Sequence, residues 1–282
     1  MTLPLDKLGT RYESRTATID PERAKAYAAA TNDDNPAYTS GKFAPPIFGV
    51  VPTWDALTVV MAELITADMF MMLVHGEQDM HFHQPLVPGR TLVSTGDAHS
   101  VRVAGSGTRI TAHLESVDSE TGEPVLEIYN TVFIRGLTGG DNGGPDKPDH
   151  TFPDDARARP VGEFTTHVDD DQTFRYRDVS GDMNPIHVDN DFATSVGLPG
   201  IINHGLCTMA MTSQAVVKTV ADGDPARLKR LAVRFSKNVF PGNDVTTTIY
   251  EAGEAEGRKV YAYEAHSAGE LVIANGRAEI DA

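Results

Sequence analysis

The sequence predicts an α+β protein made of two tandem units, each with one long helix packed on an antiparallel sheet. Three observations lead to this fold class. The two halves of the chain share short matches in the same order. Each half has one segment with apolar residues at helical spacing, and runs of alternating apolar and polar residues follow it. One helix with several strands, present twice, is typical of α+β architectures.

The internal repeat is carried by three ordered matches. YAAATNDDNP at 27–36 aligns with YRDVSGDMNP at 176–185, an offset of 149 residues. Two further matches follow with only a small drift in offset: PLVPGRTL (85–92) with VFPGNDV (239–245), and GTRITAHLESV (107–117) with GRKVYAYEAHS (257–267). Because ordered self-similarity is the sequence signature of repeated structure, we interpret the chain as a duplicated domain.

Each half has one segment that predicts a core helix. The first is 54–66 and the second is roughly 206–220. In both, residues three or four positions apart form one stripe, as expected for a helix with one buried face. The stripe residues are Leu57, Val60, Met61 and Leu64 in the first helix, and Leu206, Ala210, Ser213 and Val217 in the second.

The runs after each helix predict half-buried strands. RITAHLESV places Ile110, Ala112 and Leu114 on one side and polar residues on the other, which is the two-residue period of a strand. The turn SETGEP then leads to LEIYNTVFIR, and the second half ends with VTTTIYEAG, RKVYAYEAHS and LVIANGRAEI.

Residues 136–160 separate the halves. This stretch is rich in Gly, Pro and Asp and has almost no apolar content, so we expect a linker that buries no surface. The predicted domains are therefore 1–135 and 161–282.

Composition excludes several classes of protein. The formal net charge of −16 argues against general binding to nucleic acid or to an anionic membrane. The longest apolar-rich stretch, 50–73, is interrupted by charged residues, which argues against a membrane span. A single cysteine, Cys207, and an N-terminal stretch without the apolar core of a signal peptide favour a reducing compartment. We expect a cytoplasmic protein.

The segment YRDVSGDMNPIH, 176–187, contains a candidate acid–base pair. On a continuous helix, side chains five residues apart point about 140° apart. Pro185 disfavours a helical conformation at Asn184, so the helix should stop by about 182–184. With the chain bent there, Asp182 and His187 can converge on one water molecule. Alone, Asp182 could be only a turn residue.

A second element follows at Asn203-His204-Gly205-Leu206, directly before the second helix. The first N–H groups of a helix have no internal acceptor and carry partial positive charge. Glycine lets a carbonyl oxygen approach such an N–H closely. Gly205 is therefore a candidate oxyanion site for a thioester. We expect His204 to orient this loop through hydrogen bonds.

Together, YRDVSGDMNPIH and the later HGL resemble the signature of the MaoC-like, (R)-specific enoyl-CoA hydratases, also called type-two hydratases. The duplication resembles their double-hot-dog members, in which a long helix is wrapped by an antiparallel sheet, and HGEQDMHFHQPLVPG at 75–89 is similar to their first domain. The resemblance implies that Asp182 and His187 hold and activate water, that Asn184 assists, and that the Gly205 N–H binds the thioester oxygen. It also implies an acyl-CoA substrate and a homodimer.

The first half departs from this pattern. Asp33 and Asn35 match the motif, but Tyr38 stands where His187 does, and seven fewer residues precede Gly49, the counterpart of Gly205. Tyrosine, with an ordinary pKa of about 10, is a poor base at neutral pH. We expect one working site, in the second half. By analogy with the family, the first half becomes a catalytically degenerate unit that accommodates the acyl chain.

The predicted reaction is the reversible hydration of trans-2-enoyl-CoA to (3R)-3-hydroxyacyl-CoA. Two alternatives remain open: a hot-dog acyl-CoA thioesterase and a non-catalytic acyl-thioester-binding subunit. The sequence does not decide which of the two side chains is the base, nor does it identify the acyl group.

Coenzyme A carries phosphates, and the densest basic run is RLKRLAVRFSK, 227–237. Arg234 and Lys237 are candidate phosphate ligands. The competing interpretation is a solvated strand edge.

We expect no cofactor and no metal site. His81 and His83 would share one strand face, but a metal site needs three or four convergent ligands. Apart from His75 and Asp79, nothing nearby in sequence supplies them.

Overall fold

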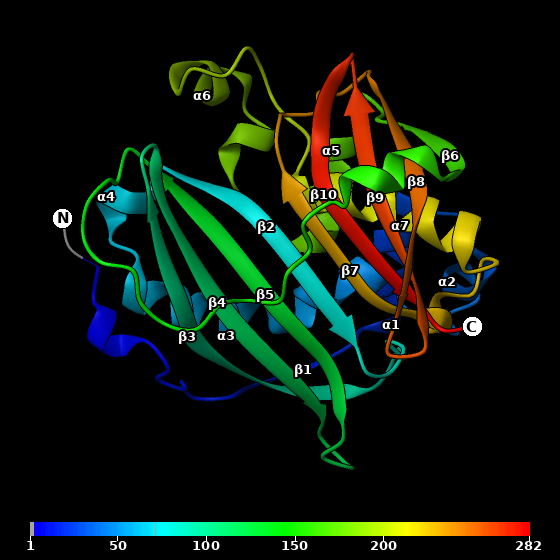
Figure 1. The fold of residues 1–282 in the computed structure, drawn as a ribbon, viewed down its shortest axis with the longest axis horizontal. Helices are drawn as coiled ribbons and strands as arrows, with labels where there is room; N and C mark the ends of the chain where they lie inside the picture. Colours follow the sequence, from blue (N-terminus) through cyan, green and yellow to red (C-terminus); the bar gives the residue numbers. More distant parts are fainter. Residues whose placement is uncertain (1–2, 71) are drawn as a thin grey trace.

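The structure is a computed structural model that describes residues 3–70 and 72–282. Ten strands form one antiparallel sheet, and the long helices α3 and α7 lie behind it when it is viewed as in Figure 1. The helices are α1 (Pro21–Ala30), α2 (Pro36–Thr39), α3 (Val50–Leu64), α4 (Ala67–Phe70), α5 (Gln172–Ser180), α6 (Asn190–Ser195) and α7 (Gly205–Val220). The strands are β1 (Arg15–Thr18), β2 (Leu73–Phe82), β3 (Thr91–Ala104), β4 (Gly107–Asp118), β5 (Pro124–Arg135), β6 (Pro160–His167), β7 (Leu228–Phe235), β8 (Asp244–Ala255), β9 (Arg258–Ser267) and β10 (Glu270–Ile280).

The strand order confirms the duplication. It runs β1-β3-β4-β5-β2-β7-β10-β9-β8-β6, so the second half repeats the first in mirror order across the β2–β7 boundary. In Figure 1 the strands β2–β5 of the N-terminal unit occupy the left side of the sheet and β7–β10 of the C-terminal unit the right, while α1 and α2 lie behind the C-terminal strands. The predicted α+β class is therefore confirmed, with the two sheets fused into one.

A buried ion pair joins the two units at the centre of the sheet. The guanidinium of Arg230 on β7 donates to both carboxylate oxygens of Asp79 on β2, at 3.0 and 2.7 Å, and contacts Glu279 at 3.3 Å. Both partners of the Arg230–Asp79 pair are almost fully buried. Removing one partner of such a pair typically costs about 3–5 kcal/mol, because the other charge is left without compensation.

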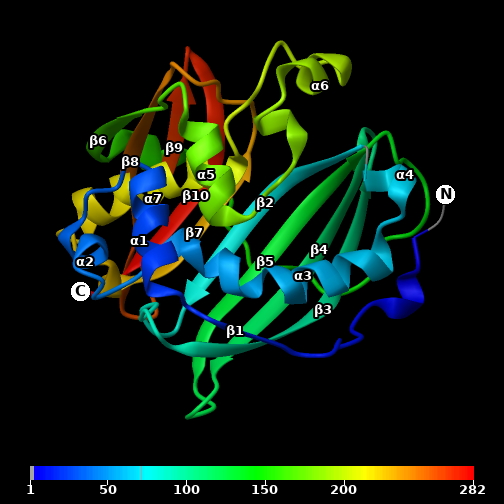
Figure 2. The same ribbon diagram turned by 180° about the vertical axis from the view of Figure 1, so that it is seen from behind.

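The central helices match the sequence prediction with small differences. Helix α7 spans Gly205–Val220 as expected, whereas α3 begins at Val50, four residues before the predicted start. The 3₁₀ turn Pro46–Gly49 leads directly into α3, which explains the earlier start. Figure 2 shows α3 lying across the strands of the N-terminal unit. Among the described residues, Pro46–Leu64 alone has the length and composition of a membrane-spanning helix, and here it is a core helix.

Helices α1 and α5 pack against each other where the two units meet. The hydroxyl oxygens of Tyr27 and Tyr176, which are 149 residues apart, lie 2.8 Å from each other in a buried hydrogen bond. These are the first residues of the two aligned segments. The repeat detected in the sequence therefore corresponds to an approximate twofold relation in space.

Residues 136–160, hereafter the strap, cross the face of the sheet opposite the long helices (Figure 1). Arg102 on β3 donates to three strap carbonyls, and Lys147 pairs with Glu77 at 2.7 Å. The expectation that this segment buries no surface is wrong, because Leu137, His150, Phe152 and Ala156 are buried. Polar contacts hold the backbone of the strap against the sheet. A few large side chains are therefore enough to bury part of it.

Candidate active site

The segment between α5 and α7 bends as the sequence predicts. Helix α5 ends at Ser180, two residues before the expected limit, because Gly181 adopts a left-handed conformation (φ 83°) that terminates it. The carboxylate of Asp182 then accepts the Asn184 N–H at 3.1 Å, and the Asn184 side chain accepts the Ile186 N–H at 3.3 Å. Asn184 therefore shapes the turn that carries its neighbours.

Asp182 and His187 converge. Their ligand atoms, together with one from His204, all lie within 4.8 Å of one another. Two hydrogen bonds of about 2.8 Å each can span such a gap through a single water molecule. Asp182 is partly exposed, whereas His187 is 6% exposed. A carboxylate at the solvent side and an imidazole behind it form an acid–base arrangement.

The His187 ring is held in one orientation. Its Nδ1 donates to the carbonyl oxygen of Ile202 at 2.8 Å, which leaves the Nε2 lone pair available to accept a proton. Burial lowers the pKa of His187, although the Ile202 hydrogen bond and the nearby Asp182 carboxylate oppose the shift. The imidazole is therefore neutral at neutral pH, as a general base must be.

His204 packs against this base. Its ring stacks on the His187 ring with centroids 3.8 Å apart and an interplanar angle of 24°. Its Nε2 lies 3.4 Å from the backbone oxygen of Asp182. Burial, and then the neighbouring His187, lower its pKa to about 3, so it is also neutral. These contacts support the expectation that His204 orients the loop.

Gly205 begins α7, directly after His204. Its N–H has no acceptor inside the helix and lies at the positive end of the helix dipole. A Cβ at this position would lie 3.4–3.6 Å from the ring of Phe235, so the space beside the glycine is bounded by an aromatic side chain. This arrangement suits an acceptor oxygen approaching the start of the helix.

The N-terminal unit also contributes to the site, through His75 on β2. The His75 and Phe235 ring centroids are 4.8 Å apart. Burial lowers the pKa of His75 to about 4, while a hydrogen bond to the amide oxygen of Gln78 and the carboxylate of Asp182 oppose the shift. Sequence reasoning missed this residue, because only the β2–β7 pairing brings it close to Asp182. The only sequence signal for His75 was the similarity of residues 75–89 to the first domain of double-hot-dog family members.

The basic run divides into two groups. Arg227, Lys229 and Arg230 are paired with Asp222, Asp281 and Asp79, respectively. Arg234 and Lys237 are exposed on either side of Phe235, and no carboxylate within residues 3–70 and 72–282 pairs with them. The two predicted phosphate ligands are thus the cations of the run without a carboxylate partner among the described residues, and they flank Phe235 in the sequence.

Comparisons with known proteins agree with this geometry. Residues 154–269 match the family described as MaoC like domain, and residues 38–136 match the MFE-2 hydratase 2 N-terminal domain. A protein from Dictyostelium discoideum named probable enoyl-CoA hydratase 2 is 30% identical over 209 residues, covering 73% of this chain and 70% of the relative.

The chain belongs to the MaoC-like dehydratase family. The 3-hydroxyacyl-thioester dehydratase Y of Mycobacterium tuberculosis is 32% identical, with 73% of this chain and 72% of that protein covered. The crystal structure of a MaoC-like dehydratase from Phytophthora capsici superimposes with a TM-score of 0.86 at 26% identity, covering 98% of this chain and 97% of that one. The resemblance inferred from the motif is confirmed, and this MaoC-like protein is an enzyme of the hydratase/dehydratase class. A double-hot-dog structure from Mycobacterium tuberculosis, at 13% identity and a TM-score of 0.63, supports the predicted fold.

The expected cytoplasmic location is contradicted. Relatives of this MaoC-like protein from Arabidopsis thaliana, Drosophila melanogaster, mouse and yeast are named peroxisomal, although the chain spans only 61% of the first and 36% of the second. Organelle addresses are short signals read by receptors, so charge and cysteine content do not encode them.

Proposed function

We propose that this protein reversibly hydrates trans-2-enoyl-CoA thioesters to (3R)-3-hydroxyacyl-CoA. The observation that carries the proposal is the approach of Asp182 and His187 to within 4.8 Å of each other, beside the residue that precedes α7. The relatives named enoyl-CoA hydratase 2 and 3-hydroxyacyl-thioester dehydratase support the same chemistry.

The geometry supports a specific division of roles. The Gly205 N–H donates to the thioester oxygen and polarises the conjugated double bond. A water molecule held by Asp182 loses a proton to Nε2 of His187 as its oxygen bonds to C3. The proton is then delivered to C2, so the elements of water are added and nothing is oxidised or reduced. The Nδ1 bond to Ile202 fixes the tautomer that this role requires.

A hydration assay tests the proposal. The full-length protein is given trans-2-enoyl-CoA substrates of increasing chain length, loss of the conjugated absorbance is followed, and the product is analysed on a chiral column. We expect the (3R) product, and His187→Gln should lower kcat by about 10²–10⁴-fold, which is typical for a general base. Near-normal turnover by this variant, or a (3S) product, would contradict the proposal.

The same assay separates the alternatives. A thiol reagent detects free CoA, whose release without hydroxyacyl product would indicate a thioesterase. Binding of crotonyl-CoA with no change in absorbance would indicate a non-catalytic subunit.

We also propose that Arg234 and Lys237 bind the CoA phosphates. The support is their exposure, their lack of carboxylate partners among the described residues and their position around Phe235. Arg234→Glu should raise KM for CoA thioesters roughly two- to fivefold with kcat little changed, since an exposed charge contact is worth about 1 kcal/mol or less. Lys259→Glu, an equal charge change at an exposed lysine of β9, is the matched control. An equal rise in KM for the two variants would contradict the assignment of Arg234 to phosphate binding.

We propose further that the N-terminal unit accommodates the acyl chain. A cleft of about 230 Å³ lies against Ser180 and Gly181, immediately before Asp182. Most of its lining comes from the N-terminal unit, including Ala17 and Pro52. Ala17→Phe should narrow the cleft and shift the chain-length preference toward shorter substrates. An unchanged profile would place the acyl chain elsewhere.

A further inference from the structure

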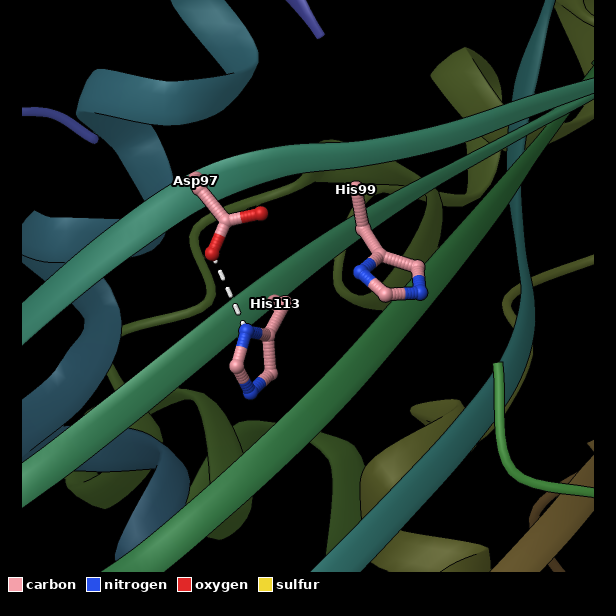
Figure 3. Close-up of side chains that lie close together, drawn as sticks. All are labelled: Asp97, His99 and His113. Carbon is pink, nitrogen blue, oxygen red and sulfur yellow. Dashed lines mark hydrogen bonds and ion pairs between the residues drawn. The ribbon is translucent and has the colours of Figure 1, made fainter. Parts of the chain in front are cut away.

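A second cluster of titratable side chains lies on the sheet of the N-terminal unit, away from the candidate active site. Asp97 and His99 project from β3 and His113 projects from β4 (Figure 3). One ligand atom from each of the three lies within 4.8 Å of the other two. Among the described residues, this trio and the one at the active site are the groups of histidines and carboxylates that come this close.

The strands hold the cluster in place. Asp97 and His113 are directly opposite each other in the antiparallel β3–β4 pairing, and Nδ1 of His113 lies 3.0 Å from Oδ2 of Asp97. The register of β3 shifts between Ala98 and Ser100, so an irregularity falls at His99 itself. Such irregularities commonly re-aim a side chain, and Figure 3 shows the His99 ring beside the other two residues.

Both imidazoles are oriented by oxygen atoms on their far sides. Nε2 of His113 lies 2.9 Å from Oε1 of Glu127, which also accepts the Tyr129 hydroxyl at 2.8 Å. Nε2 of His99 lies 3.4 Å from the carbonyl oxygen of Asp146 in the strap. A histidine that binds a metal almost always donates its other ring N–H to a carboxylate or carbonyl. In both residues this leaves Nδ1 as the nitrogen for a ligand.

We propose that Asp97, His99 and His113 form a binding site for a divalent transition-metal ion of the Zn²⁺ type. Two imidazole nitrogens and one carboxylate oxygen are ligands that suit zinc, and three protein ligands with solvent in the remaining position form an open zinc site. Metal–ligand bonds of about 2.0–2.2 Å place tetrahedral ligand atoms roughly 3.3–3.6 Å apart. The Asp97 and His113 atoms, which are 3.0 Å apart, must therefore separate slightly, and the His99 nitrogen must draw closer by up to roughly an ångström. Side-chain rotation on fixed strands can supply that change.

The metal competes with a proton at His113. Burial alone would lower the pKa of this residue, but hydrogen bonds to Asp97 and Glu127 outweigh it and raise the pKa to about 9. The ion takes the place of the proton between Nδ1 and Asp97, while the Nε2 hydrogen bond to Glu127 is kept. Through His99 and Asp146, bound metal also fastens the strap to the sheet.

The sequence-based expectation of no metal site considered only neighbours of His81 and His83. The three residues of this cluster come from two strands and become neighbours only through the β3–β4 pairing. The site is separate from the hydration chemistry and does not depend on the proposed function.

The test is a Zn²⁺ titration of the chelator-treated full-length protein by calorimetry, with Co²⁺ absorption as a second readout of coordination. We expect one bound equivalent in the wild type. His99→Gln should weaken binding at least tenfold, and Glu127→Gln, which removes only the orienting carboxylate, about 10–100-fold. His99 makes a single long contact with the strap, so this variant should keep its fold, which circular dichroism checks.

Two matched variants locate the metal. His187→Gln removes a member of the active-site trio, and His266→Gln removes an exposed histidine of the C-terminal unit. Both should bind one equivalent with wild-type affinity. The proposal is overturned if wild-type protein binds no Zn²⁺, if His99→Gln binds as tightly as the wild type, or if His187→Gln abolishes binding.

Discussion

The two repeats share one turn but differ in what surrounds it. In the C-terminal unit, Asp182 accepts the N–H of the residue two positions later at 3.1 Å, and Asp33 does the same at 3.1 Å in the N-terminal unit. In both, the following asparagine accepts an N–H two residues further on. The Asp-x-Asn-Pro segment therefore folds in the same way with or without a catalytic partner, because its own side chains satisfy its backbone.

The surroundings of the two turns differ in ways that support the proposal of one working site, in the C-terminal unit. Phe48 occupies the position of His204 and packs edge-to-face on Tyr27, whereas the His204 ring is tilted by 47° against that of Tyr176. Tyr38 is 1% exposed, and its hydroxyl has no partner among the described residues. At Gly49, a Cβ would lie only 2.8 Å from a methyl carbon of Leu126, with Leu86 and Met80 also close. Aliphatic side chains thus fill the space that a thioester would need.

The largest expected effect on kcat comes from replacing the equivalent aspartates of the two repeats, Asp182 and Asp33, one at a time. Asp182→Asn should lower kcat for enoyl-CoA hydration by about 10²–10⁴-fold, because an amide has neither the negative charge nor the acid–base capacity of the carboxylate. Asp33→Asn, the same change in the other repeat, should leave kcat within about twofold, a change that corresponds to less than ~0.5 kcal/mol in the barrier. Steady-state kinetics on both variants measures the contrast. Equal losses would mean that both repeats take part in catalysis.

Replacing His204 tests how much this residue contributes to the loss of folding stability at acidic pH. Its folded pKa of about 3 is below its unfolded value of about 6.5, so its contribution to stability is complete above pH 6.5 and is lost as the pH falls toward 3. His204→Phe, which copies Phe48, should remove about 2 kcal/mol of the decrease in unfolding free energy between pH 7.5 and 5. Urea denaturation at the two pH values measures this. His75, with a pKa of about 4, should leave a residual slope in the variant.

The two helix-start glycines should respond in opposite ways. Gly49→Ala should lower the free energy of unfolding by about 1–3 kcal/mol, because its Cβ overlaps the packed side chain of Leu126. Gly205→Ala meets only the Phe235 ring at ordinary contact distance, so it should keep its stability. Its N–H is retained, but the added methyl group hinders the approach of the thioester oxygen, so kcat should fall roughly ten- to a hundredfold, less than the loss of a whole oxyanion donor. Urea denaturation measures the free energy of unfolding of both variants, and steady-state kinetics measures their kcat. A stable Gly49→Ala variant would show that Leu126, Leu86 and Met80 do not fill the space beside Gly49.

The smallest effect is a gain in stability. Burial raises the pKa of Asp33 to about 6, above an unfolded value near 3.8, so the buried carboxylate is unfavourable above pH 6 and this penalty fades as the pH falls. Asp33→Asn should therefore raise the free energy of unfolding by about 1–2 kcal/mol at pH 7.5 and by less at pH 4.5. Urea denaturation at both pH values checks the sign. A loss of stability at pH 7.5 would show that hydrogen bonds of the charged form outweigh its burial.

Local patterns predicted most of the regular structure. Alternation located β4 with Ile110, Ala112 and Leu114 in the core, and helical spacing located α7. Element ends were less accurate: α5 stops at Ser180 because a left-handed glycine ends it before the proline can. The strap was misjudged because composition does not reveal a few well-placed buried residues such as Phe152.

The amino-acid sequence by itself determined the duplication and the fold class, because aligned segments and local periodicity in the two halves reveal them. It also determined the Asp182–His187 pair, because this pair lies within one short stretch whose backbone obeys local rules. Tertiary structure alone decided the rest. Strand pairing brought His75 to Asp182 from the other unit, placed Asp97 opposite His113, and left Arg234 and Lys237 without carboxylate partners among the described residues. These neighbours are far apart along the chain, and their meeting depends on the register of the whole sheet, which no local pattern specifies.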